Sequence, residues 1–271
     1  MWRCEDGLLQ VVSGVTSPLL AIDGPTGRYY PRWGRRLPSA TTLIGQLAKP
    51  GLLDWIKRKV AEAALSGCSL QDAMSAPDDH RDKAGRLGDA VHGHAENMMR
   101  AVMDYATDDE LREYVKAIPE AKVRSRTGSW LQWFFDYRPI PLYVEATLFN
   151  EDKGYAGSCD LIAVIPGFND DGAIATDYKT SKGVYGTVAL QLGMYTDAET
   201  LVDDDGVEYE NPARGSSVAA VLHIKPHSYE FRAVDLTGVE RAISALCAIK
   251  YWLDNYEATA IGLPIEIGVS E

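Results

Sequence analysis

The chain has 271 residues, of which 46% are hydrophobic and 24% charged, and its formal net charge at pH 7 is −12. This composition is typical of a globular protein that buries a sizeable core in one large domain or two small ones. The negative charge argues against a protein that coats DNA non-specifically, because phosphate binding requires Lys and Arg. It does not exclude an enzyme with one local basic track.

No apolar run approaches the roughly 20 residues that a bilayer requires, and acids interrupt the start of the chain where a signal peptide needs an apolar stretch. We therefore expect a cytoplasmic protein with no membrane partner. The four cysteines are far apart and form no CxxC pair, so we expect free buried thiols rather than a zinc ribbon or a disulfide framework. The chain lacks a glycine-rich P-loop, so we expect no nucleotide cofactor.

The segment 1–36 is predicted to be irregular or β-rich, because Gly and Pro interrupt it, and it is the most basic part of the chain. Ser39 is a good N-cap residue for a short helix in SATTLIGQLA. A helix N-terminus beside Arg35 and Arg36 can bind a phosphate, because its free N–H groups and positive dipole end attract anions. The alternative is a simple capped helix beside a solvated basic loop.

The next part of the chain, up to Pro139, is predicted to be helical. His92 lies on an apolar helix face with Val91 and Ala95. Taken alone, a histidine in this setting is more often a core residue than a metal ligand. The expected helices span residues 51–65, 69–75, 77–105, 108–118 and 120–136.

After Pro139 the hydrophobic pattern changes to a period of two, which predicts strands over 142–149, 154–165 and 173–179. A helix to about Leu201, an acidic turn over 203–212, a hairpin over 216–236 and a helix over 236–260 are expected to follow. We expect one compact unit, made of an N-terminal basic and helical region (1–138), a core (139–260) and a tail (261–271).

The three predicted strands carry ionisable side chains. On the first, Val144, Ala146 and Leu148 are expected on one face and Glu145 on the other. On the third, Asp177 and Lys179 are two residues apart and therefore face the same side. Unpaired charge near a core is unfavourable by several kcal/mol, so such a cluster usually binds a metal or performs chemistry.

Phosphodiester hydrolysis needs an activated water, stabilisation of charge and help for the leaving oxygen, and one or two Mg²⁺ or Mn²⁺ ions can supply all three. Asp160 and Asp177, on neighbouring antiparallel strands, offer the oxygen ligands that Mg²⁺ prefers, and the backbone carbonyl of Tyr178 can add another. Lys179 reaches the same cleft, where it can orient the water or stabilise charge on the phosphate.

These motifs, in this order, resemble the PD-(D/E)XK nuclease superfamily, specifically its RecB-like branch with a Q-x-x-x-Y motif. The matching residues are His92, then Gly157 to Asp160, then Asp177-Tyr178-Lys179, then Gln191 to Tyr195. Each motif alone is weak, but the ordered set is specific, and it covers roughly residues 35–235. The resemblance implies an α/β (α+β) fold with a restriction-endonuclease-like core, in which helices flank a mixed central sheet.

The resemblance also implies roles for the matching residues. Asp160, Asp177 and His92 are expected to bind the metal, and Lys179 to be the catalytic lysine. Glu145 matches an acidic residue of the first core strand, which binds a second metal or the water. The remaining matches, expected to support the site or contact DNA unless they only pack the helix, are Gln191 and Tyr195.

The expected activity is that of a Mg²⁺- or Mn²⁺-dependent deoxyribonuclease. The chain is similar to phage-type exonucleases and to CRISPR-associated RecB-like nucleases, but it lacks the cysteine cluster of the latter, so we expect no iron–sulfur cluster. Lambda-type exonucleases hold a 5′ phosphate with an arginine and a serine near the first helix. The residues of similar character here are Arg35, Arg36 and Ser39.

The resemblance implies an exonuclease that acts on linear duplex or single-stranded DNA ends in phage recombination or replication. Its expected partners are DNA, a single-strand annealing protein and further copies of the chain, since lambda-type relatives form rings. Three alternatives remain. They are a structure-specific or restriction-type endonuclease on the same fold, a non-catalytic DNA-binding or assembly protein, and an acidic metal-binding structural protein.

Overall fold

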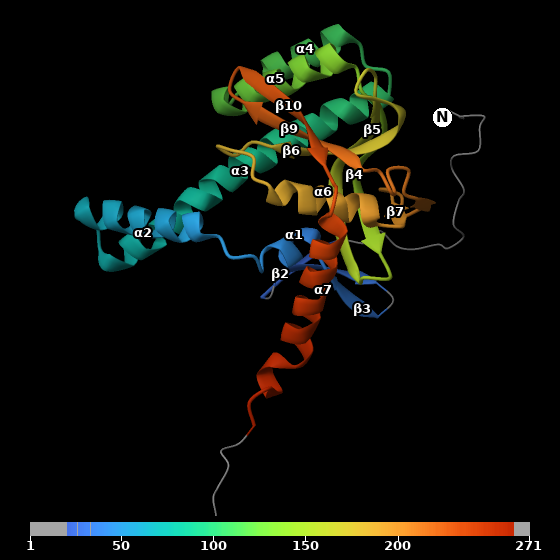
Figure 1. Cartoon of the computed structure of the whole chain (residues 1–271). Helices are drawn as coiled ribbons and strands as arrows, with labels where there is room; N and C mark the ends of the chain where they lie inside the picture. The colour runs from blue at the N-terminus through green and yellow to red at the C-terminus, as the bar shows by residue number, and fades with distance from the viewer. Residues whose placement is uncertain (1–20, 26, 33, 263–271) are drawn as a thin grey trace, which may run out of the picture.

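The computed structural model describes residues 21–25, 27–32 and 34–262, apart from the side chains of residues 169–171. These residues form an α+β fold, in which helices cover both faces of a central mixed sheet (Figure 1). The expected fold class and the flanked mixed sheet are therefore confirmed. The expectations for the first 20 residues, including Cys4, and for the tail beyond residue 262 lie outside the described residues.

The central sheet has seven strands in the order β10-β9-β6-β5-β4-β7-β8. Neighbouring strands are antiparallel except for β6 and β9, which are parallel and are joined through α6. A second, antiparallel sheet has the order β1-β2-β3. The strands of the central sheet are β4 (Ile140–Asn150), β5 (Tyr155–Ile165), β6 (Asn169–Lys179), β7 (Thr200–Val202), β8 (Glu208–Glu210), β9 (Val218–Lys225) and β10 (Ser228–Asp235). Those of the second sheet are β1 (Ile22–Gly24), β2 (Gly27–Arg32) and β3 (Arg35–Pro38).

The helices divide between the two faces of the central sheet. Helices α1, α6 and α7 lie on one side, and α3, α4 and α5 on the other, whereas α2 projects from the body beside the first part of α3 (Figure 1). Their bounds are α1 (Ala40–Ile44), α2 (Pro50–Leu65), α3 (Leu70–Met103), α4 (Asp108–Ala117), α5 (Ala121–Tyr137), α6 (Thr187–Asp197) and α7 (Val239–Asn255). None of the helices in the described ranges is long and apolar enough to cross a membrane.

The core has two main parts, one on each face of the sheet. Under α6 and α7, Ala175, Leu192 and Ile243 belong to one buried cluster. Under α3 and α5, Val91 and Trp130 pack in a separate cluster. Because both faces of the sheet are buried, ionisable groups on its central strands must be paired, protonated or bound to a cation. The three described cysteines are free, but only Cys159 is buried as expected, whereas Cys247 is half-buried and Cys68 is exposed.

The predicted break before Pro77 is wrong, because α3 is a single helix from Leu70 to Met103. A proline inside a helix removes one hydrogen bond and is unfavourable by about 3 kcal/mol. Ala73 and Pro77 are nevertheless both buried, and α2 packs along this part of α3 (Figure 1). Tertiary packing therefore offsets the local penalty.

The helix that was expected to reach Leu201 ends at Asp197, and Leu201 belongs to β7. The side chain of Leu201 is fully buried, and its backbone pairs with Leu148 of β4. The predicted acidic turn contains β8, which pairs with β7. The chain leaves the helix and pairs as a strand here because the amide of Asn211 caps the end of α6. This amide donates to the carbonyls of Tyr195 and Ala198.

The contact between α6 and α7 should tolerate no added methyl group at Gly193. A Cβ there would lie 2.6 Å from Cγ2 of Val239, so Gly193→Ala is expected to destabilise the protein by about 1–3 kcal/mol. In the described structure, a Cβ at Gly85 of α3 would meet nothing within 4 Å, so Gly85→Ala should stabilise by up to about 1 kcal/mol. Thermal unfolding tests this pair, and a shift of both variants in the same direction would contradict the packing.

Candidate metal centre

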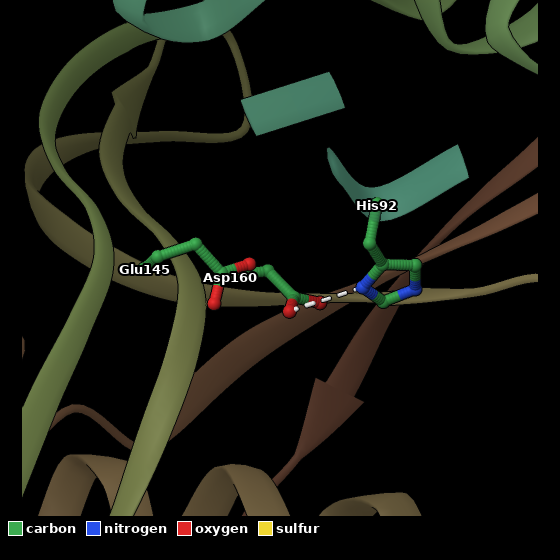
Figure 2. A group of neighbouring side chains, drawn as sticks. All are labelled: His92, Glu145 and Asp160. Carbon is green, nitrogen blue, oxygen red and sulfur yellow. Dashed lines mark ion pairs between the residues drawn. The ribbon is translucent and has the colours of Figure 1, made fainter. Parts of the chain in front are cut away.

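One side chain from each of α3, β4 and β5 meets the others at a single point. His92, Glu145 and Asp160 each offer a ligand atom, and these atoms all lie within 4.8 Å of one another. Figure 2 shows the imidazole of His92 facing the carboxylate of Asp160, with Nδ1 of His92 3.3 Å from Oδ1 of Asp160. The spacing of such a group suits a single cation. His92, which was assigned to the site from the resemblance, therefore lies beside Asp160 as expected.

Glu145 reaches this point through an unusual backbone. Its φ is +53°, a left-handed conformation that is strained for a residue with a side chain and unfavourable by about 1–3 kcal/mol. Its neighbours Val144 and Ala146 pair with Leu161 and Cys159, so Glu145 stands opposite Asp160. The strand is therefore bent out of its regular alternation at the position where the two carboxylates meet.

The same irregularity contradicts the predicted faces of this strand. Val144 packs under α3 and α5, whereas Ala146 and Leu148 pack under α6 and α7. The three residues were expected on one face, and this prediction is wrong. A period of two holds only while each residue is extended, so one left-handed residue moves the following side chains to the other face.

Asp160 is held by two donors. The main-chain N–H of Tyr178 donates to its Oδ2, and His92 lies on the other oxygen. Burial acts to raise the pKa of Asp160, but His92, the N–H of Tyr178 and the charge of Lys179 together outweigh it, so the pKa lies below its usual range. For His92, burial acts to lower the pKa, and the interaction with Asp160 outweighs it in turn and raises the pKa. The pair therefore favours its ionic form.

Asp177 lies beside this group but outside it. Its carboxylate contacts Nζ of Lys179 at 2.5 Å and accepts a hydrogen bond of 2.9 Å from Nε2 of Gln191. Lys179 donates in turn to Oε1 of Gln191 at 3.2 Å, and Gln191 also donates to the hydroxyl of Tyr195 at 2.8 Å. The two predicted motifs D-x-K and Q-x-x-x-Y are therefore joined in one hydrogen-bonded chain.

Gly157 makes this arrangement possible. A Cβ at this position would lie 2.7 Å from Cε1 of Tyr195, closer than side chains pack. The ring of Tyr195, which is 4% exposed, therefore lies directly across the backbone of β5. The glycine of the G-x-x-D motif is explained by this close approach.

Two carboxyl groups of the site hold their protons more tightly than usual. Burial, followed by the charges of Asp160 and Glu96, raises the pKa of Glu145 to about 8. Burial and the charge of Asp160 raise the pKa of Asp177 to about 6, against the opposing effect of Lys179. In the absence of a cation, Glu145 and Asp177 therefore bind protons at a higher pH than ordinary carboxyl groups do.

Two residues of this site were missed in the sequence. Glu96 lies one helical turn after His92 on α3 and contributes to the raised pKa of Glu145. Arg100, another turn on, donates to Oε1 of Glu96 at 3.0 Å and to the carbonyl of Val144 at 3.3 Å. The i, i+4 spacing from the histidine was the available signal. Arg100 thereby satisfies a carbonyl beside the left-handed Glu145.

The predicted phosphate-binding residues lie in the second sheet and at the start of α1. Ser39 is 3% exposed, and its hydroxyl accepts from the N–H of Thr42 and bonds with two threonine hydroxyls. It therefore serves as the N-cap of a helix of only five residues. Arg35 and Arg36 are exposed, and Arg36 lies over the ring of Tyr29.

The donor set fits a hard divalent cation. Carboxylate oxygens suit Mg²⁺ and Mn²⁺, whereas an imidazole nitrogen is a softer ligand than Mg²⁺ usually takes. One histidine with Glu145 and Asp160 therefore favours Mn²⁺ over Mg²⁺. The backbone of Tyr178 contacts the site through its N–H, and the ligand role of its carbonyl stays a prediction.

The stability of the metal-free protein should fall as the pH rises from about 5 to 8. The pKa values of Glu145, Asp177 and His92 are raised in the folded protein, so each group stabilises the fold below its unfolded pKa and loses that effect as pH rises through the folded value. A metal needs the carboxylates ionised, so Mn²⁺ should raise the melting temperature more at pH 8 than near pH 5.

Thermal unfolding with and without Mn²⁺ at the two pH values measures this effect. Glu145→Gln removes one of the titrating groups, so the metal-free variant should show a weaker dependence on pH than the wild type. An equal effect of Mn²⁺ at both pH values would contradict the assignment of the raised pKa values.

Comparisons with known proteins give little guidance here. No family model matches the chain, and no curated protein matches it. Among solved structures, the crystal structure of SSO0001 aligns with 63% of this chain and 76% of its own length, with 18% sequence identity and a TM-score of 0.28. A TM-score this low supports no conclusion about fold or activity, so the function has to be argued from the site.

Proposed function

We propose that this chain is a metal-dependent deoxyribonuclease of the PD-(D/E)XK type, in the RecB-like branch, and that it acts as an exonuclease. The observation that carries the proposal is the meeting of His92, Glu145 and Asp160 within 4.8 Å of one another. Beside this group, Asp177 and Gln191 hold an ammonium group, which an acidic structural metal site does not need.

The proposed chemistry divides between the metal and the chain. A cation held by His92, Glu145 and Asp160 would activate water and stabilise charge on the phosphate. The ammonium group of Lys179, which is 30% exposed, donates hydrogen bonds to a phosphate oxygen or to the attacking water. Asp177 and Gln191 fix the direction of this group.

Glu145 adds a proton acceptor to this arrangement. Its pKa is about 8 in the metal-free protein, so when it does not bind the metal its carboxylate is ionised, and can take a proton from the water, at about pH 8 and above. Asp177 as a direct ligand remains part of the proposal, because its carboxylate lies close enough to Asp160 for the two charges to interact.

DNA as the substrate, and an exonuclease as the kind of enzyme, come from the motif resemblance. The same resemblance suggests a role in phage recombination or replication, a single-strand annealing partner and assembly into oligomers. The exposed Arg35 and Arg36 would then contact the DNA backbone. Retention of Asp160, Asp177 and Lys179 argues against a protein that has kept the fold and lost the activity.

The exonuclease proposal predicts metal-dependent loss of nucleotides from linear DNA labelled at either end. Closed circular DNA should stay intact, and EDTA should stop the reaction, with Mn²⁺ supporting at least as much activity as Mg²⁺ because of the histidine ligand. Gel analysis of both substrates measures this. Nicked circles would favour the endonuclease instead, and intact DNA with every metal would contradict a nuclease.

Lys179→Ala should reduce cleavage by about 10²-fold or more, because it removes a donor aimed at the developing charge. The matched control is Lys182→Ala, an exposed lysine on the loop that follows β6. Rates from the end-labelled assay, with circular dichroism to verify folding, separate the two. Full activity of Lys179→Ala, or an equal loss in both variants, would remove Lys179 from the proposed mechanism.

A further inference from the structure

Tyr178 stands between Asp177 and Lys179 on β6, yet its ring lies on the other face of the sheet. The ring is 3% exposed and belongs to the core under α3 and α5. Asp177 and Lys179 point instead toward Gln191 of α6. The D-x-K motif therefore presents its two ionisable groups on one face and an aromatic ring on the opposite one.

The ring of Tyr178 contacts His92 directly. Their ring centroids lie 5.9 Å apart with an interplanar angle of 70°, an edge-to-face contact. Two further edge contacts hold the tyrosine itself, one with Trp130 at 6.4 Å and one with Trp133 at 6.1 Å. Both indoles are fully buried on α5, so they hold the ring of Tyr178 in place against His92.

The backbone of the same residue contacts the second member of the site. The N–H of Tyr178 donates to Oδ2 of Asp160, while Oδ1 of Asp160 lies against Nδ1 of His92. One residue therefore touches two of the three candidate ligands, the carboxylate through its main chain and the imidazole through its side chain.

We propose that Tyr178 is a positioning residue of the metal centre, whose ring fixes the orientation of His92 for metal binding. This inference rests on the metal centre of the proposed function. An imidazole can rotate about its Cβ–Cγ bond, and ligand rotation away from the cation lowers affinity. Groups that orient a metal ligand without touching the metal typically contribute 10–100-fold in affinity.

The hydroxyl of Tyr178 has no part in this role. Burial raises the pKa of this hydroxyl well above its usual range, against the opposing effect of the Trp130 indole, so it stays protonated. The hydroxyl and the Trp130 indole nitrogen are both buried without a well-formed hydrogen bond. Removing the hydroxyl alone therefore breaks no strong interaction.

The test compares Mn²⁺ affinity, measured from the electron paramagnetic resonance of free Mn²⁺, in three single variants. Tyr178→Leu should weaken binding by about tenfold or more, because it removes the ring. Tyr178→Phe keeps the ring and should bind as the wild type does. The matched control is Phe134→Leu, which alters the same core where Phe134 stacks on Trp130 at 5.8 Å, and it should also bind normally.

The His92→Ala background separates orientation of the histidine from a general effect on the strand. In that background Tyr178→Leu should cause no further loss of affinity, because the ring has no imidazole to orient. Circular dichroism verifies folding, and Tyr178→Met, whose flexible unbranched side chain fills irregular gaps, replaces a Leu variant that does not fold.

Three results would overturn the inference while leaving the metal centre intact. They are an unchanged affinity in Tyr178→Leu, a comparable loss in Phe134→Leu, and an equal loss from Tyr178→Leu with and without His92. A wild-type protein that binds no Mn²⁺ would remove the metal centre itself, and the inference with it.

Discussion

Three carboxylates lie close together in the middle of a sheet whose two faces are buried, and this concentration of negative charge is the constraint on which the rest of the structure depends. They belong to Glu145, Asp160 and Asp177, on three adjacent strands. Two of these carboxylates have a basic side chain of the same chain beside them: His92 contacts Asp160, and Lys179 contacts Asp177. Glu145 holds a proton up to about pH 8 instead. A bound cation would replace that proton, which is how the fold and the proposed chemistry are connected.

The constraint also explains where the backbone departs from regular structure. Glu145 adopts a left-handed conformation in the middle of a strand, and Arg100 donates to the carbonyl of Val144 beside it. Both His92 and Arg100 come from α3, so one helix contacts Asp160 and the carbonyl beside Glu145 together. Strain of this kind persists where surrounding contacts over-determine it, and it clusters at functional sites.

Much of the site could be predicted from the sequence, because its motifs follow simple periodicities. A spacing of two places Asp177 and Lys179 on one face of β6, and a spacing of four places Gln191 and Tyr195 on one face of α6. The structure joins these residues in one hydrogen-bonded chain. The change from helical to two-residue periodicity at Pro139 predicts where the core strands begin, whereas the mixed order of the sheet and its flanking helices came from the motif resemblance.

The rest depended on contacts that local patterns do not contain. The left-handed residue at Glu145 reverses the faces within β4, and no turn residue marks it. Pro77 stays inside α3 because α2 packs beside it, and Leu201 joins β7 because β4 is available to pair. The group that lies within ligand distance includes Glu145 rather than Asp177, since Lys179 and Gln191 hold the aspartate.

The central claim is that His92, Glu145 and Asp160 hold a divalent cation. The most direct measurement is anomalous diffraction at the manganese edge from crystals of the protein grown with Mn²⁺ near pH 8, where Glu145 can ionise. The account predicts an anomalous peak bonded to these three side chains. Crystals with Mn²⁺ bound only at other residues, or with no peak between these three at saturating metal, would contradict it.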